Sequence, residues 1–318
     1  MNLFTEIKIW IKSIRLTYWI IRNDVLYIIR KGAIGDILWT EPVIRKLAGQ
    51  GNEILYVNGA PELFENYPFK NIKFVHKDKK EYKRIPRILK FIGKQHLFIE
   101  LDNAYEKDVQ TEPTLHVYQR TAGLPTENTL PIIHLTDTEK QLFSNNKPYV
   151  VVHIEFPIAK KNHKQIHGIE WQAIFDYLNL KGFDVYLIAQ EKTNYQQVIQ
   201  LQTSLREMFS LVLNARFFIG LDSGPSNIAE VLRVPQIVFF GSVNPSFWRL
   251  PEYFDGIIMQ QPCEYAGCFH RAKKTKKDYS CLLIGDEGSP KCCLFKNEEL
   301  IAAIDTMTLR IADKNPIQ

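Results

Sequence analysis

The chain has 318 residues, of which 45% are hydrophobic and 24% are charged, and its formal net charge is +5. This composition excludes a disordered or fibrous protein, and the length suffices for two domains of about 150 residues each. The positive charge is too small to demand a nucleic-acid partner, and none is expected.

Residues 1–24 are predicted to form an amphipathic helix. Apolar residues such as Trp10 and Trp19 are interleaved with basic ones such as Lys8 and Lys12. The apolar run is too broken for a signal peptide and too short for a membrane span of about 20 residues, so a cytoplasmic protein is expected. The helix either lies on the inner leaflet of a membrane, as in a peripheral protein, or packs against its own domain.

Residues 25–140 are predicted to form a first domain in which strands and helices alternate. Strands are expected at 25–30, 53–57, 69–76 and 95–101, and helices from residue 37 onward and over 81–94. A glycine-punctuated turn containing Gly32 and Gly35 follows the first of these strands. Alternating strands and helices predict a parallel sheet covered on both faces.

A polar stretch at 135–148 is interpreted as the linker to a second domain, residues 149–318. Strands are expected there at 149–154, 184–189, 217–221 and 236–240, and helices at 170–180, from about residue 193, over 205–214 and after Pro225. Both halves follow the plan of a doubly wound α/β sheet, which binds ligands at the carboxyl ends of its strands. Two such sheets facing each other would enclose a cleft, where function is expected.

The segment 217–241 reads as strand, loop, helix and strand, and it is the best candidate for a phosphate site. The run Asp222-Ser223-Gly224-Pro225 breaks the apolar strand, and Ser223 and Pro225 suit the start of a helix. A helix N-terminus offers unpaired N–H donors and a favourable dipole to a nucleotide diphosphate. The alternative is an ordinary turn between a strand and a helix.

Two separated motifs carry a family resemblance. The first is Ile28-Ile-Arg-Lys-Gly-Ala-Ile-Gly-Asp-Ile-Leu-Trp-Thr-Glu-Pro42. The second combines Thr203-Ser-Leu-Arg-Glu207, Phe218-Ile-Gly-Leu-Asp-Ser-Gly-Pro225 and Val234-Pro235 with Phe240-Gly241. Together they resemble the family-nine glycosyltransferases, the lipopolysaccharide heptosyltransferases, over roughly residues 25–248.

The resemblance implies a GT-B fold of two Rossmann-like domains, with the acceptor on the N-terminal one and a nucleotide sugar on the C-terminal one. It implies an inverting transfer of a heptose from ADP-heptose to a lipopolysaccharide-type acceptor, in lipopolysaccharide biosynthesis, with no cofactor required for catalysis. Two alternatives stay open, a transferase of the same fold that glycosylates a protein and a non-catalytic module that binds nucleotide sugars. A nicotinamide enzyme is disfavoured, because Gly32 and Gly35 lack the Gly-x-Gly-x-x-Gly spacing.

By the resemblance, Asp36 is the catalytic carboxylate that takes the acceptor proton, although an Asp at a helix start is often only a cap. Gly32 and Gly35 would let the substrates approach the backbone, or they merely shape the turn. Lys164 resembles the lysine of a Lys-x-Trp-Pro element that neutralises the leaving diphosphate, with Lys160 and Lys161 as competitors.

Asp222, Ser223 and Gly224 resemble the family's donor-site triplet, in which the carboxylate holds sugar hydroxyls and the other two meet the phosphates. Two positions depart from the pattern. Asn227 stands where many relatives carry His, and Ile166 stands where Trp is expected. Asn donates a hydrogen bond but carries no charge, so the diphosphate would be stabilised less or by another group.

All five cysteines lie within residues 263–293, at positions 263, 268, 281, 292 and 293. In a cytoplasmic protein this clustering favours thiolate ligands of a structural zinc or iron ion over a disulfide framework. The predicted ligands are Cys263, Cys268, Cys281 and Cys292, with His270 as a spare. Buried free thiols are the alternative.

Overall fold

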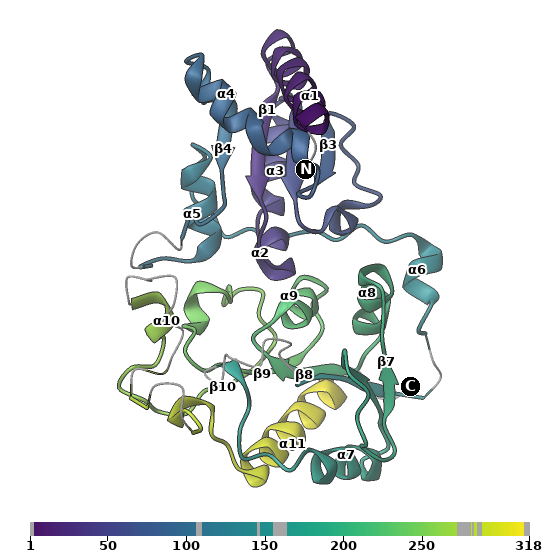
Figure 1. Ribbon diagram of the computed structural model, residues 1–318. Coiled ribbons are helices and arrows are strands. Elements are labelled where there is room, and N and C mark those ends of the chain that lie inside the picture. Colours follow the sequence, from purple (N-terminus) through teal and green to yellow (C-terminus); the bar gives the residue numbers. More distant parts are fainter. Residues whose placement is uncertain are drawn as a thin grey trace. The chain divides into compact units, whose positions relative to one another are not determined.

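The computed structural model describes residues 3–105, 110–144, 147–154, 164–271, 281, 283–284 and 288–314 (Figure 1). The chain divides into two compact units. Unit 1 comprises Met1–Tyr105 and Thr114–His134, and unit 2 comprises Glu106–Pro113 and Leu135–Gln318. Each unit is built on one sheet.

The sheet of unit 1 has four strands in the order β3-β2-β1-β4. They are β1 (Leu26–Arg30), β2 (Ile54–Asn58), β3 (Ile72–His76) and β4 (Phe98–Glu100). Every pair is parallel, and Ile28 of β1 is in register with Tyr56 and Ile99. The four strands and the parallel sheet expected from the sequence are confirmed, although β4 is preceded by a 3-10 turn, η3 (Gln95–Leu97).

Prolines mark the starts of two helices in unit 1. The helices of this unit are α1 (Leu3–Arg22), α2 (Ile34–Leu38), α3 (Glu41–Gly49), α4 (Ile85–Phe91) and α5 (Thr114–Thr121), with 3-10 turns η1 (Pro61–Phe64) and η2 (Lys80–Arg84). The helix expected from residue 37, with Pro42 as its bending point, is instead two helices, because α2 ends before Pro42 and Pro42 lies in the first turn of α3. The helix expected over 81–94 likewise begins as η2 and becomes α-helical only near Pro86.

The sheet of unit 2 has six parallel strands in the order β10-β9-β8-β5-β6-β7. They are β5 (Tyr149–His153), β6 (Asp184–Ile188), β7 (Ile199–Leu201), β8 (Phe217–Leu221), β9 (Gln236–Phe239) and β10 (Gly256–Met259). The chain winds outward from β5 in one direction and then outward from β8 in the other. This is the strand order of the Rossmann fold.

Helices cover both faces of this second sheet. Figure 1 shows α8 and α9 on one face and α7 and α11 on the other. The helices are α6 (Asp137–Gln141), α7 (Trp171–Leu180), α8 (Leu205–Leu213), α9 (Gly224–Val231), α10 (Cys268–Arg271) and α11 (Asn297–Lys314), with 3-10 turns η5 (Pro245–Phe247) and η6 (Lys291–Cys293). The doubly wound α/β class is therefore confirmed for this unit.

One local expectation in unit 2 is wrong. No helix starts near Thr193, because its amide and hydroxyl both donate to Oε1 of Gln200 and so fix an irregular segment that leads into β7. Within the stretch interpreted as the linker, 135–148, Thr136 and Glu139 form a capping box that starts α6.

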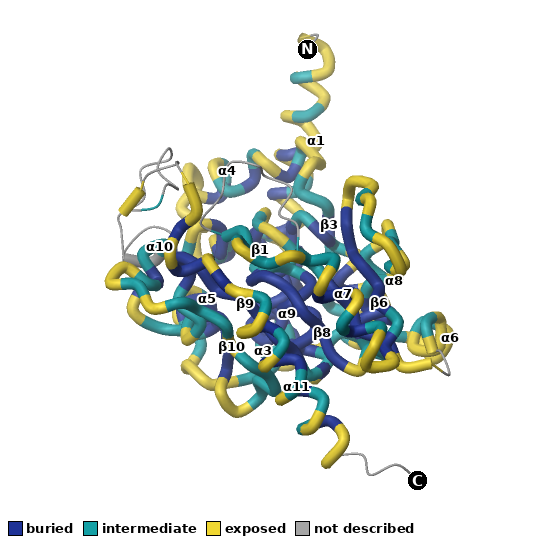
Figure 2. The backbone as a smooth tube through the Cα atoms, turned by 90° about the horizontal axis from the view of Figure 1, so that it is seen from below, coloured by how far each residue is buried: buried dark blue, intermediate teal, exposed yellow. Residues whose placement is uncertain are grey.

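The core of each unit lies against its sheet. In Figure 2, β8 is buried along its length, whereas most of α1 and α6 is exposed. One cluster packs β5, β6, β8 and β9 against α7 and α11, and the other packs β1 and β2 against the helices of unit 1. Among the described helices, none combines the length and the hydrophobicity that crossing a bilayer demands.

Candidate active site

Each sheet reverses its winding at one point, and the residues singled out in the sequence follow the strands at these points. In unit 1 the reversal lies between β1 and β4, and Asp36 follows β1. In unit 2 it lies between β5 and β8, and Asp222 and Ser223 follow β8 directly. Open α/β sheets bind ligands outside the carboxyl ends of their strands at such switch points. Each unit therefore presents a candidate half-site.

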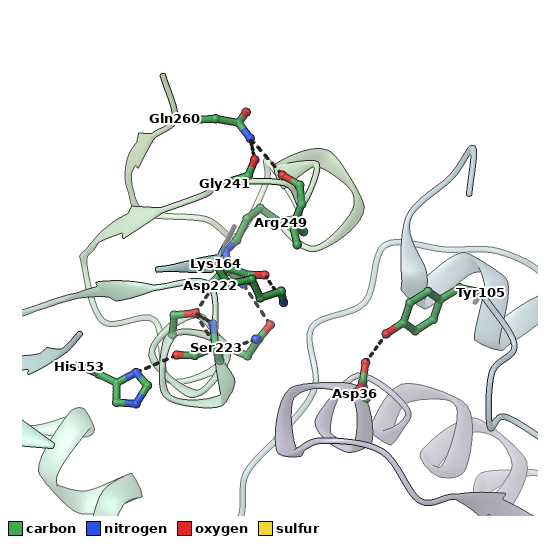
Figure 3. Close-up of polar contacts among 12 residues, drawn as sticks. Asp36, Tyr105, His153, Lys164, Asp222, Ser223, Gly241, Arg249 and Gln260 are labelled. Carbon is green, nitrogen blue, oxygen red and sulfur yellow. Dashed lines mark hydrogen bonds and ion pairs between the residues drawn. The ribbon is translucent and has the colours of Figure 1, made fainter. Parts of the chain in front are cut away.

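In unit 1, three donors hold the Asp36 carboxylate, which is 14% exposed. Arg30 Nη2 lies 3.0 Å from Oδ2, the Ala33 amide donates to the same oxygen over 3.2 Å, and the Tyr105 hydroxyl donates to Oδ1 over 2.7 Å (Figure 3). The Ala33 bond makes Asp36 a cap of α2, as the simpler interpretation required. The two further donors go beyond capping and fix the orientation of the carboxylate.

The partner of Asp36 was not singled out in the sequence. Arg30 is the last residue of β1, is 2% exposed, and donates from Nη1 to the Leu101 carbonyl over 3.0 Å. Its guanidinium also lies 5.4 Å from the centre of the Tyr105 ring. Arg30 was visible only as the end of an apolar strand. A buried arginine in such a position signals an acidic partner, because an unpaired buried charge is costly.

Gly32 is required by this ion pair. A Cβ atom built at Gly32 would lie 2.9 Å from Nε and Nη2 of Arg30 and 2.9 Å from Oδ2 of Asp36. A side chain at this position would therefore displace one or both partners. The interpretation that Gly32 shapes the turn is thus supported, because only a residue without a side chain leaves room for the ion pair. Gly35 lies buried in the first turn of α2.

In unit 2, two cations face the Asp222 carboxylate. Lys164 Nζ lies 3.4 Å from Oδ2 and Arg249 Nη2 lies 3.8 Å from Oδ1 (Figure 3). Asp222 is 9% exposed, and the Lys164 ammonium also lies 5.4 Å from the centre of the Phe269 ring. The structure thus brings Lys164 and Asp222 together although 58 positions separate them. The competitors of Lys164, residues 160 and 161, lie outside the described residues.

Ser223 occupies the N-cap position of α9, and Gly224 is the first residue of that helix. The Ser223 hydroxyl lies 3.1 Å from Nδ1 of His153, the last residue of β5. Burial lowers the pKa of His153 to about 4, so its ring is neutral near pH 7. The two strands that flank the switch point are thereby joined by a side-chain hydrogen bond at their carboxyl ends.

Comparison with known protein families decides the class. Residues 96–278 match the family described as glycosyltransferase family 9 (heptosyltransferase), which is more than half of the chain. The chain belongs to glycosyltransferase family 9. The match includes Lys164, Asp222, Ser223 and Asn227, whereas Asp36 lies outside it.

Individual relatives of this family 9 chain are distant. Lipopolysaccharide heptosyltransferase 3 of Escherichia coli is 28% identical over 116 residues, which amount to 32% of this chain and 33% of that protein. The match thus spans about a third of this curated relative.

Solved structures resemble the whole fold. Iron-containing dodecameric glycosyltransferase TibC of enterotoxigenic E. coli gives a TM-score of 0.69 at 16% identity, covering 90% of this chain and 76% of TibC. ADP-heptose lps heptosyltransferase II of E. coli gives 0.63 at 13% identity, covering 90% and 99% of the two chains. These likenesses confirm the GT-B fold class, with one parallel sheet in each domain.

The Asn227 departure from the family pattern is joined to the buried arginine Arg249. Asn227 donates to the Ser223 carbonyl over 2.7 Å and accepts from Arg249 Nη1 over 3.0 Å. The same Nη1 lies 2.8 Å from Oε2 of Glu230, and Nη2 donates to Ser226 over 2.9 Å. Arg249 is 3% exposed and Glu230 1%. A cation therefore stands beside Asn227 at the start of α9, where the sequence suggested that positive charge was lost.

Arg249 was missed because nothing in its neighbourhood of the sequence distinguishes it. It follows Trp248 in a loop after β9 and belongs to neither family motif. Glu230 gave the only signal, since a carboxylate on the buried face of a predicted helix needs a partner. Burial raises the pKa of Glu230, and the charge of Arg249 opposes that rise.

The other departure, Ile166, is accommodated by packing. Its side chain is partly buried against the core cluster of unit 2, which also contains Phe295. The next residue, His167, pairs with the C-terminal segment: its amide donates to the Cys293 carbonyl and its carbonyl accepts from the Phe295 amide, both over 2.9 Å. The segment carrying Lys164 is thus anchored to the segment carrying two of the cysteines.

The five cysteines are free thiols, two of them buried. Burial, together with the neighbouring charges of Cys292, Cys281 and Cys263, raises the pKa of Cys268 to about 11. Sγ of Cys292 lies 3.8 Å from Sγ of Cys293, whose hydrogen bond lowers the Cys292 pKa to about 7. Within the part of the chain that the structure describes, no group of three or more His, Cys, Asp or Glu residues is placed to hold a metal ion. The His270 side chain lies outside that part.

Proposed function

We propose that this chain transfers a heptose from ADP-heptose, with inversion, to a hydroxyl group of a lipopolysaccharide-type acceptor. The observation that carries the proposal is the surroundings of Asp222, a buried carboxylate at the switch point of unit 2, faced by Lys164 and Arg249 and followed by the start of α9. Such an edge suits an anionic nucleotide with a sugar attached. The family match and a TibC structure described as a complex with ADP-D-beta-D-heptose agree with this choice of donor.

Each group of unit 2 then has a task. The Ser223 hydroxyl and the Gly224 amide meet the phosphates at the positive end of the helix dipole, and Asp222 holds sugar hydroxyls. Lys164 exchanges part of its contact with Asp222 for the diphosphate and forms a charge-assisted hydrogen bond that strengthens as the leaving group gains charge. Arg249 keeps Asn227 and the first turn of α9 in place.

Asp36 is proposed as the base. A carboxylate has about four lone-pair positions, and Arg30, Ala33 and Tyr105 occupy three of them. The fourth is available to the acceptor hydroxyl, whose proton passes to Asp36 while its oxygen bonds to the anomeric carbon. The bond from that carbon to the diphosphate oxygen breaks and ADP leaves with the electron pair. One displacement of this kind inverts the anomeric centre and needs no cofactor.

The test is release of ADP from ADP-heptose with and without a heptose-deficient lipopolysaccharide acceptor, next to a panel of other nucleotide sugars. Asp36→Asn keeps the size of the side chain, and we expect the transfer rate to fall by about a hundredfold or more. Asp313→Asn, at an exposed position of α11, is the matched control and should leave the rate unchanged. A folded Asp36→Asn variant with the wild-type rate would refute the role of Asp36. Binding of the donor without turnover by the wild type would refute the transferase itself.

We further propose that the reaction takes place in the cytoplasm. Five free thiols in a chain of this size suit a reducing compartment. Expression in a bacterial host with separate assay of the cytoplasmic and periplasmic fractions tests this directly, and finding the chain disulfide-bonded in the periplasm would contradict it.

A structural zinc or iron ion at Cys263, Cys268, Cys281 and Cys292 is proposed as well. The donor chemistry suits either ion, because both accept thiolate ligands and the four cysteines lie close together in the sequence. The TibC structure is described as iron-containing. Metal analysis of the purified chain should return one zinc or iron, lost in Cys263→Ser and kept in Cys293→Ser, the control outside the predicted set. A metal-free wild type, or loss in both variants alike, would contradict the assignment.

A further inference from the structure

α1 carries large apolar side chains on its exposed side as well as on the side that packs against its own domain. The fully buried residues of α1 are Ser13, Thr17 and Ile20, and the Ser13 hydroxyl donates to the Glu81 carbonyl over 2.7 Å. Leu16 and Ile21 also pack, partly buried, against the core of unit 1. A surface helix ordinarily turns its apolar stripe toward the core and its polar residues toward water. Packing against unit 1 accounts for Leu16, Ile20 and Ile21, but it does not account for the apolar side chains that α1 leaves exposed.

Those apolar residues form a continuous stripe on the outside. Leu3, Ile7, Ile11, Ile14 and Tyr18 follow each other at steps of three or four residues, which places them on one face of a helix. Each is between 45% and 72% exposed, and Figure 2 shows α1 as mostly exposed. We call these five residues the outer stripe. Side chains of this size exposed together mark an interaction surface.

A basic strip adjoins the outer stripe. At 100° per residue, Lys8, Lys12 and Arg15 fall on the sector next to the stripe and away from the buried face. The one acidic residue of α1, Glu6, is ion-paired with Arg84. The exposed surface of the helix therefore combines an apolar stripe with a positive flank.

From this juxtaposition we propose that α1 docks unit 1 on an anionic lipid surface. The outer stripe enters the boundary between headgroups and acyl chains, and Lys8, Lys12 and Arg15 pair with lipid phosphates. A helix lying in the plane of the membrane needs this division into an apolar and a cationic face, and it needs no membrane-spanning length. The inference does not depend on the proposed transfer reaction.

A second copy of the chain fits this surface less well. The spacing of the outer stripe would suit a pair of helices, but each copy would bring Lys8 and Arg15 to the edges of the shared seam. Glu6, the acidic residue within α1, is already ion-paired with Arg84. A symmetric pair therefore places like charges opposite each other, whereas anionic lipid neutralises them.

Flotation of the full-length chain with vesicles tests the proposal without any substrate. We expect it to float with vesicles of equal parts phosphatidylglycerol and phosphatidylcholine, and far less with phosphatidylcholine alone. Lys8→Gln combined with Lys12→Gln should weaken the partition constant by about fivefold for each lysine, or roughly thirtyfold together. Ile7→Ser, Ile11→Ser and Ile14→Ser combined should weaken it by about tenfold or more.

Two matched controls test whether removing any exposed apolar side chain or any exposed charge weakens vesicle binding. Leu180→Ser with Leu309→Ser removes exposed apolar side chains from unit 2, and Lys70→Gln with Lys192→Gln removes exposed charges away from α1. Both should float like the wild type, and all variants should keep the wild-type unfolding midpoint. A wild type that does not float, or α1 variants that float as well as the controls, would overturn the proposal. So would a wild-type oligomer that the isoleucine variant converts to monomers, since the face would then join copies of the chain.

Discussion

Replacing Arg249 by Met tests how the buried ion pair supports the candidate donor site. Methionine keeps much of the side-chain volume but removes the contacts to Oε2 of Glu230 at 2.8 Å, to Oδ1 of Asn227 at 3.0 Å and to Ser226 at 2.9 Å. The carboxylate of Glu230 is then left buried opposite an apolar group.

The magnitude follows from that uncompensated charge. Removing one partner of a buried pair costs about 3–5 kcal/mol, which is a large share of the roughly 5–15 kcal/mol that holds a domain folded. Glu230→Gln in the Arg249→Met background removes the orphan charge, so the double variant should be more stable than Arg249→Met alone. The loss in Arg249→Met should also shrink as the pH falls, because a protonated Glu230 carries no charge to bury. Burial already raises the pKa of Glu230, and without Arg249 the proton binds at a higher pH still.

Urea unfolding followed by tryptophan fluorescence measures these free energies between about pH 8 and pH 5. Proteins tend to be most stable in about this range. Arg216→Met, at an exposed position, is the control and should stay within about 0.5 kcal/mol of the wild type. Equal stabilities for Arg249→Met and the control would refute the reasoning. So would an Arg249→Met deficit that Glu230→Gln fails to reduce, because the cost would then come from packing rather than from charge.

Three further changes test the two half-sites. The unfolding free energy of the wild type should fall by about 2 kcal/mol more than that of His153→Gln between pH 7 and pH 5. The reason is that the unfolded chain binds a proton at His153 near pH 6.5, whereas burial holds the folded pKa at about 4. Equal slopes for variant and wild type would contradict this. Gly32→Ala should lower the transfer rate by about tenfold or more by displacing the ion pair beside Asp36, whereas Gly49→Ala, which meets no atom within 4 Å, should not. Lys164→Met should raise the Kd for ADP by about tenfold or more in calorimetry, and an unchanged Kd would remove it from the phosphate site.

The sheets were predictable because buried parallel strands are written as short apolar runs. Tyr149–His153 and Phe217–Leu221 were found within one residue, since each is a β-branched or aromatic run closed by a polar residue. Helix boundaries were predictable where a capping box marks them, as at Ser204, and failed where a proline divides a helix, as at Pro42. The error at Thr193 has another cause, because one glutamine side chain from seven residues away determines that segment.

The candidate site was only half visible for a related reason. Asp222 and Ser223 stand directly after a strand and Asp36 lies in the first helix after one, where position alone draws attention to a polar residue. Arg30 and Arg249 act through contacts that no local pattern encodes, because each partner is brought near by tertiary packing. The Asn227 departure therefore suggested a loss of positive charge that the folded chain compensates.

The parallel sheet of unit 2 determines where a label can be attached to this protein. Every proposed ligand contact in that unit lies at the carboxyl ends of the strands. The edge formed by the amino ends carries none of these contacts and is a spare edge for labelling. The turn at Lys181–Gly182, just before β6, belongs to that spare edge, and Gly182 has no atom within 4 Å of where a side chain would begin. A fluorophore or a surface tether attached through an exposed residue of this turn would report on ligand capture while leaving the capturing groups untouched.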